Sequence, residues 1–402
     1  MSVQRGYQFF QNPGPTNIPE RILRAMDRVA IDFTGAEFRA LSAECFAGLK
    51  RVFKTEAGTI LAYAASGHGA WEAALVNLFS PGDHVLVIES GYFSLNWGMR
   101  AAAFGLEVET LANDWRRPAD AARLEARLAA DRQHKIKAVL AVHCETATGV
   151  AHPIAELRGA IDRAGHPALF LVDTISSLAS FDFRMDEWGV DVTVAGSQKG
   201  LMLPTGMAFT AVSPKALAAA ATASLPRVYW DWHRLLGQGP QQGYWNGTVP
   251  VHLFYGLREA LAMLEEEGLD TVFARHRRLA EATRRAVRAW QQSGQNDGPE
   301  IYALDPRAQS DSVTAVLLPE GCDADRVRAI CLDRFSVSLG GGLDRLRGHV
   351  LRIGHMGDLN EPMILGTLAA VEMALALARV PHGKGGIAAA MDFLAGETAN
   401  QD

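Results

Sequence analysis

One lysine, Lys199, stands in an unusual context for a charged side chain. It lies in the segment VAGSQKGLMLPTG, residues 194–206, and no acidic residue occurs within five positions on either side of it. A lysine in apolar surroundings loses hydration, so its pKa falls and its free amine becomes available as a nucleophile. A surface lysine whose stem covers apolar groups is the alternative that this segment leaves open.

Two other segments carry residues suited to binding a charged ligand. In AASGHGAWEAAL, residues Ser66, Gly67 and His68 stand where a strand turns into a helix, so their hydroxyl and amide groups would face a phosphate. In LFLVDTISS, Asp173 ends an apolar strand, and a buried carboxylate needs a cation or a strong donor. Helix caps are the alternative function of both segments. Lys199 follows Asp173 by 199 − 173 = 26 residues.

Alternating strands and helices must position these residues. The strands expected between residues 55 and 215 are TILAYAAS, HVLVIES, KAVLAVHC, ALFLVDTIS, VDVTVAGS and MAFTAVS, and HPIAELRGAIDRAG is a helix that Gly165 ends. This alternation predicts an α/β fold whose mostly parallel sheet is covered by helices on both faces. Ligands of such sheets bind at the carboxyl ends of the strands, where the polar residues gather here.

The pattern of expected strands and helices changes after residue 250. Two long helical patterns are followed by the expected strands DSVTAVLLP and HVLRIGHMG and by the apolar helix PMILGTLAAVEMALALA, which together predict a smaller α+β domain. We therefore expect an N-terminal arm at residues 1–19, a large domain at residues 20–255 and a small C-terminal domain at residues 256–402.

Composition limits the classes of partner. Of the 402 residues, 48% are hydrophobic and 21% are charged, and the net charge of −6 gives no reason to expect nucleic acid or an anionic membrane as partner. Four scattered cysteines indicate reduced thiols, and none is spaced with histidine as metal ligands are. No signal peptide and no apolar stretch of membrane-spanning length is expected, so the predicted location is the cytoplasm.

A phosphate cradle, an acid at one strand end and an isolated lysine at another form the set that pyridoxal 5'-phosphate requires. The chain resembles the class-V aminotransferases of fold type I, close to the serine–glyoxylate and alanine–glyoxylate aminotransferases. The resemblance runs nearly end to end, through NPGPTNIP, SGHGAWEA, HCETATGV, VDTISSL, GSQKGLMLP and RIGHMGDLNEPMILGTLAAVEMAL. It implies transfer of an amino group from serine or alanine to a 2-oxo acid such as glyoxylate or pyruvate.

The resemblance also implies a role for each matching residue. Lys199 would hold the cofactor as a Schiff base and then move a proton, and Asp173 would pair with the ring nitrogen. Phe93 would stack on the ring, although core packing is its alternative, and Thr146 would lie beside the phenolic oxygen. The phosphate would be held by Ser66, Gly67, His68 and Gln198.

Further residues are assigned by the same resemblance to the substrate and to a second subunit. Arg352 would bind the substrate carboxylate, and Gly14 would bring backbone close to the substrate. Thr248 and Tyr244, in GYWNGTVPV, would complete the phosphate site of the partner subunit. A homodimer with shared active sites is therefore expected.

The sequence departs from the family pattern at two places. Phe33 and Thr34 follow Asp32 where serine–glyoxylate enzymes carry His and Arg, so Phe33 would border the substrate and the identity of the donor stays open. Cys144 replaces the more usual Asn and receives no role.

The same resemblance leaves other activities of this scaffold as alternatives to aminotransfer. Pyridoxamine–pyruvate aminotransferases also lack the His-Arg pair, but the phosphate cradle argues against that alternative. A lyase is a further alternative. A desulfurase needs a cysteine before the C-terminal arginine, and FSVSLGGGLDRLRGHV has none, since Cys331 belongs to the preceding helix. A non-catalytic protein that keeps the cofactor is disfavoured because Lys199, Asp173 and Arg352 are all present.

Overall fold

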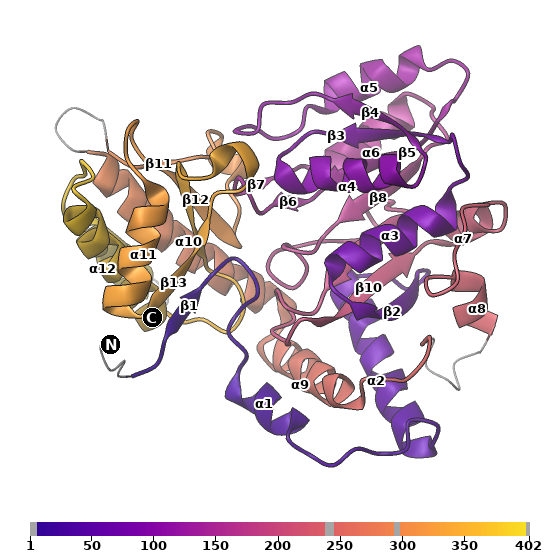
Figure 1. Cartoon of the computed structure of the whole chain (residues 1–402), viewed down its shortest axis with the longest axis horizontal. Coiled ribbons are helices and arrows are strands. Elements are labelled where there is room, and N and C mark those ends of the chain that lie inside the picture. The colour runs from indigo at the N-terminus through magenta and orange to yellow at the C-terminus, as the bar shows by residue number, and fades with distance from the viewer. Residues whose placement is uncertain (1–5, 238–244, 293–297, 399–402) are drawn as a thin grey trace.

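A seven-stranded sheet forms the centre of the larger part of the protein (Figure 1). The computed structural model describes residues 6–237, 245–292 and 298–398. Every neighbouring pair of strands in this sheet is parallel except the two pairs made by β10, which is antiparallel to β2 and to β9. The strands, in spatial order, are β2 (Thr59–Ala65), β10 (Gly206–Val212), β9 (Val192–Gly196), β8 (Leu169–Asp173), β5 (Ile136–Val142), β3 (His84–Ile88) and β4 (Glu107–Leu111).

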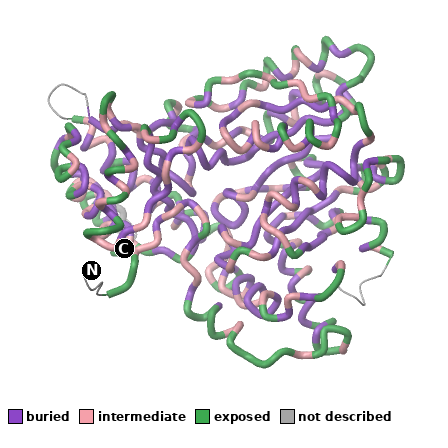
Figure 2. The backbone as a smooth tube through the Cα atoms, viewed as in Figure 1, coloured by how far each residue is buried: buried purple, intermediate pink, exposed green. Residues whose placement is uncertain are grey.

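Both faces of this sheet are buried except at the edge strand β4, because alternate residues of the other strands enter two different apolar cores. In β8, Phe170 and Val172 belong to one core, whereas Leu169 and Leu171 belong to the other. The sheet accordingly lies in the buried interior of the tube in Figure 2. Burial on both faces explains why these strands read as continuous apolar runs rather than as alternating patterns.

Two layers of helices provide the rest of the two cores. One core takes residues from α2 (Ala36–Phe53), α5 (Ala121–Ala130), α6 (Ile154–Arg163) and α9 (Val251–Glu267). The other takes residues from α3 (Gly67–Leu78), α4 (Tyr92–Ala103), α7 (Pro214–Ala220) and α8 (Trp232–Gly237). The mostly parallel, doubly covered sheet predicted from the sequence is thereby confirmed.

A five-stranded sheet organises the smaller part of the protein, at the left of Figure 1. Its order is β1 (Phe9–Gln11), β13 (Val337–Gly341), β14 (Val350–Gly354), β12 (Val313–Leu317) and β11 (Glu300–Ile301). Its helices are α10 (Leu269–Gln291), α11 (Ala324–Phe335), α12 (Glu361–Ala378) and α13 (Gly386–Thr398). This mixture of a sheet and helices confirms the expected α+β character.

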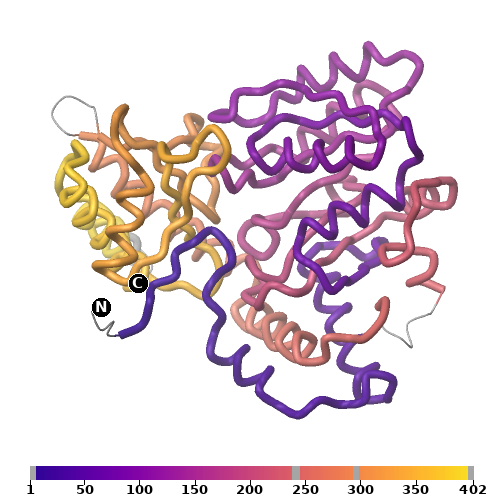
Figure 3. The backbone as a smooth tube through the Cα atoms, in the orientation of Figure 1, coloured from indigo at the N-terminus to yellow at the C-terminus, as the bar shows by residue number. Residues whose placement is uncertain are grey.

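The N-terminal segment joins the two parts. Strand β1 pairs in parallel with β13, and the indigo trace in Figure 3 runs from there towards the larger sheet and α1 (Glu20–Met26). The predicted boundary at residue 255 falls inside α9, a helix that packs on α1 and α2. The division of the chain at that residue stays a prediction.

Helix α12 corrects one expectation. Its 18 residues, Glu361–Ala378, are long and apolar enough by length and composition to cross a membrane, although the sequence analysis expected no such stretch. The helix contacts α11, α13 and β1, and 39% of its residues are buried in the structure. Contacts with helices and a strand of this kind are typical of a core helix of a small domain.

Candidate active site

A small cavity lies at the carboxyl ends of the larger sheet's strands. Its volume is about 190 Å³. Eight residues that the sequence assigned to the site line it: Gly14, Gly67, His68, Phe93, Thr146, Asp173, Gln198 and Lys199. The cavity is also lined by five residues to which the sequence analysis gave no role: Pro15, Trp71, Cys144, Ile175 and Ser176.

Lys199 is buried in the loop that follows β9, with only 8% of its surface exposed. Its Nζ donates a hydrogen bond to the backbone carbonyl of Pro13, and no carboxylate pairs with it within the described ranges. Burial and the nearby charge of Arg352 lower the pKa of Lys199 to about 8. At pH 7 about one tenth of this lysine is then the free amine, far more than for an ordinary lysine of pKa 10.5.

The N-terminal segment holds the lysine loop in place. The amide of Thr16 donates to the carbonyl of Gln198, and its hydroxyl donates to the carbonyl of Lys199 at 3.3 Å. Gly14 has φ +102°, and a Cβ on it would lie 2.3 Å from the Cδ, Cε and Nζ atoms of Lys199. Only glycine lets the backbone approach the lysine this closely.

Asp173 ends β8 and faces the same cavity with 4% of its surface exposed. Its Oδ1 accepts the amide of Ile175 at 2.6 Å, and its Oδ2 accepts the indole N–H of Trp71 at 3.0 Å. Burial, with a further contribution from Glu145, raises the pKa of this carboxyl to about 7. A carboxylate in this position is suited to an incoming cation such as a protonated ring nitrogen.

The start of α3 offers an anion cradle beside Asp173. Ser66 is the N-cap residue, yet its side chain makes no capping hydrogen bond, and the first-turn amides of Gly67 and His68 have no carbonyl within their own helix to bond. Gln198 lines the same cavity, and the NH2 group of its side-chain amide can donate to a phosphate oxygen. A Cβ on Gly67 would lie 2.3 Å from Cδ1 of Ile175, so the first turn of the helix packs closely against this cavity-lining side chain. These groups fit a phosphate.

Phe93 is positioned by a buried acid that the sequence analysis did not single out. Glu145 is fully buried, and its carboxylate accepts the amides of Phe93 and Ser94 at the start of α4 and the amide of Ala147. Burial raises the pKa of Glu145 to about 7. The local sequence HCET gave no sign of this role, because the bonds join segments that lie 51 to 52 residues apart.

Arg352, in β14, lies next to the cavity but does not line it. Its Nη1 donates to the carbonyl of Thr146 at 3.0 Å, and its Nε donates to the carbonyl of Gly341 at 2.7 Å. The side chain is buried, no described carboxylate forms an ion pair with it, and burial lowers its pKa to about 10. Thr146 itself shares a hydrogen bond with Ser176 across the cavity wall.

Cys144 faces the smaller domain as well as the cavity. Its Sγ lies 3.1 Å from the hydroxyl of Ser310 and 3.3 Å from that of Ser312. Burial raises the pKa of the thiol to about 11, which keeps it protonated and a poor nucleophile. Cys331, in α11, is buried and its pKa is raised to about 12. Neither thiol suits a desulfurase.

Phe33 and Thr248, which were assigned from the sequence, do not line this cavity, and neither do Ser66 and Arg352. Phe33 lies in an exposed loop before α2, and Thr248 is exposed. Tyr244 lies outside the described residues. Because the last two were expected to serve a partner subunit, the single chain leaves their assignment a prediction.

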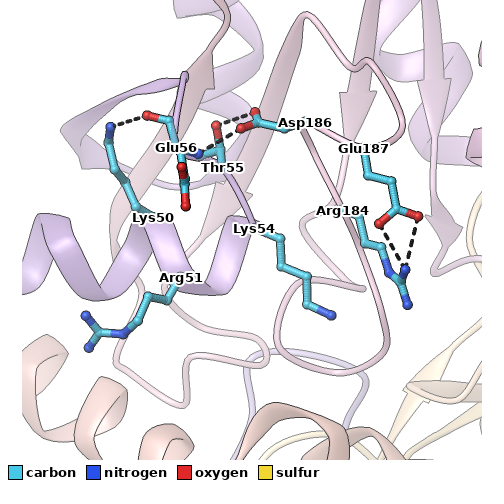
Figure 4. Close-up of a pocket in the computed structure, with 8 residues that line it drawn as sticks. All are labelled: Lys50, Arg51, Lys54, Thr55, Glu56, Arg184, Asp186 and Glu187. Carbon is cyan, nitrogen blue, oxygen red and sulfur yellow. Dashed lines mark hydrogen bonds and ion pairs between the residues drawn. The ribbon is translucent and has the colours of Figure 1, made fainter.

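A larger hollow, of about 740 Å³, opens elsewhere on the protein surface (Figure 4). It is lined by Lys50, Arg51, Lys54, Thr55, Glu56, Arg184, Asp186 and Glu187. Three of its four cations form ion pairs, Arg51 with Glu265, Lys54 with Asp182 and Arg184 with Glu187. Exposed ion pairs of this kind are typical of a solvated surface, so the smaller cavity is the better candidate.

Comparison with known proteins agrees with this geometry. The model of the family Aminotransferase class-V matches residues 8–342. The chain is 47% identical to the serine–glyoxylate aminotransferase of Methylorubrum extorquens over 95% of this chain and 94% of that protein. It is 42% identical to the L-aspartate–glyoxylate aminotransferase of Paracoccus denitrificans over 96% of each.

A solved structure supports the same conclusion. The ureidoglycine–glyoxylate aminotransferase of Bacillus subtilis superimposes with a TM-score of 0.87 and 26% identity, over 98% of this chain and all of that one. The sequence and the fold that hold the lysine, the acid and the anion cradle are thus both similar to those of known aminotransferases. The chain belongs to the class-V aminotransferase family and is an aminotransferase of fold type I.

Proposed function

We propose that this aminotransferase uses pyridoxal 5'-phosphate to move the amino group of serine or alanine to a small 2-oxo acid, glyoxylate first and pyruvate second. The observation that supports this cofactor is that one cavity holds both a buried lysine and a buried carboxylate. Among the residues that the structure describes, the lysine has no carboxylate partner and the carboxylate has no cation partner. Each group lacks what the cofactor offers, namely an aldehyde for Lys199 and a protonated ring nitrogen for Asp173.

The remaining cavity residues fit the other parts of the cofactor. The amides of Gly67 and His68 and the side chains of Ser66 and Gln198 would hold the phosphate, Phe93 would cover the ring, and Thr146 would lie beside the phenolic oxygen. When bound, pyridoxal phosphate supplies an electron-accepting ring that stabilises negative charge at the substrate Cα.

Arg352 and Lys199 would act on the substrate itself. Arg352 has two donors fixed on backbone carbonyls, which orient its guanidinium, and it is free of any described carboxylate, so it can receive the substrate carboxylate. Lys199 would carry the proton between the substrate Cα and the C4' atom of the cofactor, a task suited to an amine whose pKa is lowered to about 8. Gly14 would keep the backbone close to both.

The charges around the cavity favour a donor with one carboxylate. Arg227, a possible second cation, donates to the carbonyls of Val76, Ala223 and Leu225. Arg39 donates to the carbonyl of Thr34 in the exposed loop that also carries Phe33. Burying a second carboxylate without a cation would cost several kcal/mol. The relative from Paracoccus denitrificans, which is named for aspartate, favours aspartate as the second candidate donor.

We further propose a homodimer with shared active sites in the cytoplasm. Thr248 and Tyr244 would complete the phosphate site of the partner subunit, and the exposed Phe33 loop would border the substrate. The exposed position of Thr248 supports this role, as does the exposed pair Val228 and Tyr229 in the same stretch of chain. The four cysteines are free thiols, which supports a reducing compartment.

The experiment that tests this function measures glycine formed from glyoxylate by the purified holoenzyme with serine, alanine, aspartate, glutamate or free pyridoxamine as donor. Serine or alanine should give the highest kcat/KM, and Arg352→Lys should reduce it for every amino acid. The fastest reaction with aspartate or glutamate would refute the single-cation argument. The fastest reaction with pyridoxamine, or ammonia release without an acceptor, would instead establish the pyridoxamine or lyase alternative.

A further inference from the structure

Trp71 has a position in the site that family membership and the proposed function leave without a role. It lies on α3, one turn after the anion cradle, is fully buried and lines the cavity. Its indole N–H donates a hydrogen bond of 3.0 Å to Oδ2 of Asp173. The sequence pattern alone indicates an apolar core residue of a helix and gives no sign of a role for its indole N–H.

This hydrogen bond differs from the other bond to the same carboxylate. Oδ1 of Asp173 accepts a backbone amide, that of Ile175, whereas Trp71 is the one side chain that donates to this carboxylate in the described part of the chain. An indole N–H donates only and does not titrate. Trp71 can therefore stabilise the ionised form of Asp173 and can never take a proton from it.

The surrounding side chains fix the direction of the indole. The ring of Trp97, from α4, stacks on Trp71 with a centroid distance of 5.8 Å and an interplanar angle of 14°. His68 meets the indole edge-on at 4.5 Å, and the guanidinium of Arg100 lies 5.5 Å from its centre. With the ring held on several sides, the position of its N–H is set by packing before any ligand binds.

We propose that Trp71 is a positioning residue whose indole N–H holds Asp173 as an ionised carboxylate aimed at the ring nitrogen of the cofactor. This inference rests on the proposed function, since it needs that cofactor. The charged groups that face Asp173 are Glu145, which opposes its ionisation, and Lys199, which favours it. Trp71 acts in addition to this pair and independently of its protonation.

Trp71→Phe tests the proposal, with Trp97→Phe as its matched control. Trp97 is equally buried and belongs to the same stack, but its N–H has no hydrogen-bond partner among the described residues. Both variants thus remove an indole from one cluster, and only the first removes a bond to Asp173. Each apoenzyme is titrated, over a range of pH, with pyridoxal 5'-phosphate and with an analogue that carries C–H in place of the ring nitrogen.

Trp71→Phe should shift the acid limb of pyridoxal phosphate binding to higher pH by about one unit, which is about a tenfold loss of affinity on that limb. Loss of a donor to the carboxylate raises the pKa of Asp173, so a higher pH is needed to ionise it. Affinity for the ring-carbon analogue should not change. Trp97→Phe keeps an aromatic ring in the stack and leaves the bond from Trp71 to Asp173 in place, so it should show no pH shift with either ligand.

A merely structural role would produce other results. Equal effects of the two variants, or an equal loss with the ring-carbon analogue, would overturn the proposal. If Trp71→Phe does not fold, benzothienylalanine at position 71 keeps the ring volume while sulfur replaces the N–H, and the same shift is expected. Failure of the wild-type apoenzyme to bind pyridoxal phosphate would refute the proposed function together with this inference, whereas the outcomes above refute the inference alone.

Discussion

Gly14→Ala should displace the reacting lysine while leaving the fold nearly intact. A Cβ at this position would lie 2.3 Å from three atoms of Lys199, whereas ordinary van der Waals contact begins at 3.4 Å, so the side chain must move by 3.4 − 2.3 = 1.1 Å or more. The atoms that clash are the far end of a flexible side chain, so the lysine gives way rather than the backbone. A displacement of about 1 Å costs on the order of 100-fold in rate.

Gly82→Ala is the matched control for this substitution. Gly82 has φ +82°, near the +102° of Gly14, but an added Cβ would meet no described atom within 4 Å. Both variants should lose about 1 kcal/mol of unfolding free energy, because alanine is strained at positive φ. Urea unfolding of both variants measures the backbone strain that they share. The difference in kcat/KM between them measures the effect of the clash with Lys199, which only Gly14→Ala has. A Gly14→Ala enzyme within threefold of the Gly82→Ala enzyme would refute the close approach of the arm to Lys199.

Three further predictions concern the titratable groups of the site. Asp173→Asn should still bind the cofactor yet lose two to four powers of ten in kcat, on the order of acid–base and electrostatic effects, and a loss below about threefold would leave Asp173 only a structural role. Native Glu145 keeps its proton up to a pKa of about 7, against 4.5 for an ordinary glutamate, so this group makes the wild type less stable as pH rises between those values. Relative to the wild type, apo Glu145→Gln should therefore gain about 3 kcal/mol of unfolding free energy between pH 4.5 and pH 7, from 7 − 4.5 = 2.5 units, and a flat difference in urea unfolding would contradict this. The acylation rate of Lys199 in the apoenzyme should rise with pH through a midpoint of about 8, and a midpoint of 10 or above would show that the amine is not desolvated.

The parts of the fold that the sequence could predict are those whose pattern is local. Strands such as β8 and β9 are buried on both faces and therefore read as continuous apolar runs, and Asp173 and Lys199 stand out because each breaks such a context. Strand β4, Glu107–Leu111, was missed because it lies at the sheet edge, is only half-buried and carries two glutamates in five residues. Strand β1 was missed because its three residues owe their conformation to β13, which lies over 300 residues away.

The site was predictable to the extent that each residue carries its own chemical signal. A glycine turn before a helix, a strand-end acid and an isolated lysine do so, and the structure brings them into one cavity. Glu145 and Trp71 do not, because their roles arise from hydrogen bonds between segments 51 or more residues apart. Thr248 is expected to act in a partner subunit, and contacts between two chains leave no pattern within the sequence of one chain.

The most direct test of the central claim is to find the lysine that binds the cofactor. Borohydride reduction of the purified holoenzyme fixes the bond between pyridoxal phosphate and its lysine, and peptide mapping by mass spectrometry then locates the label. We predict a single label on Lys199 and its loss, with a folded protein, in Lys199→Ala. A label on any other lysine, or an unlabelled wild type, would contradict the account.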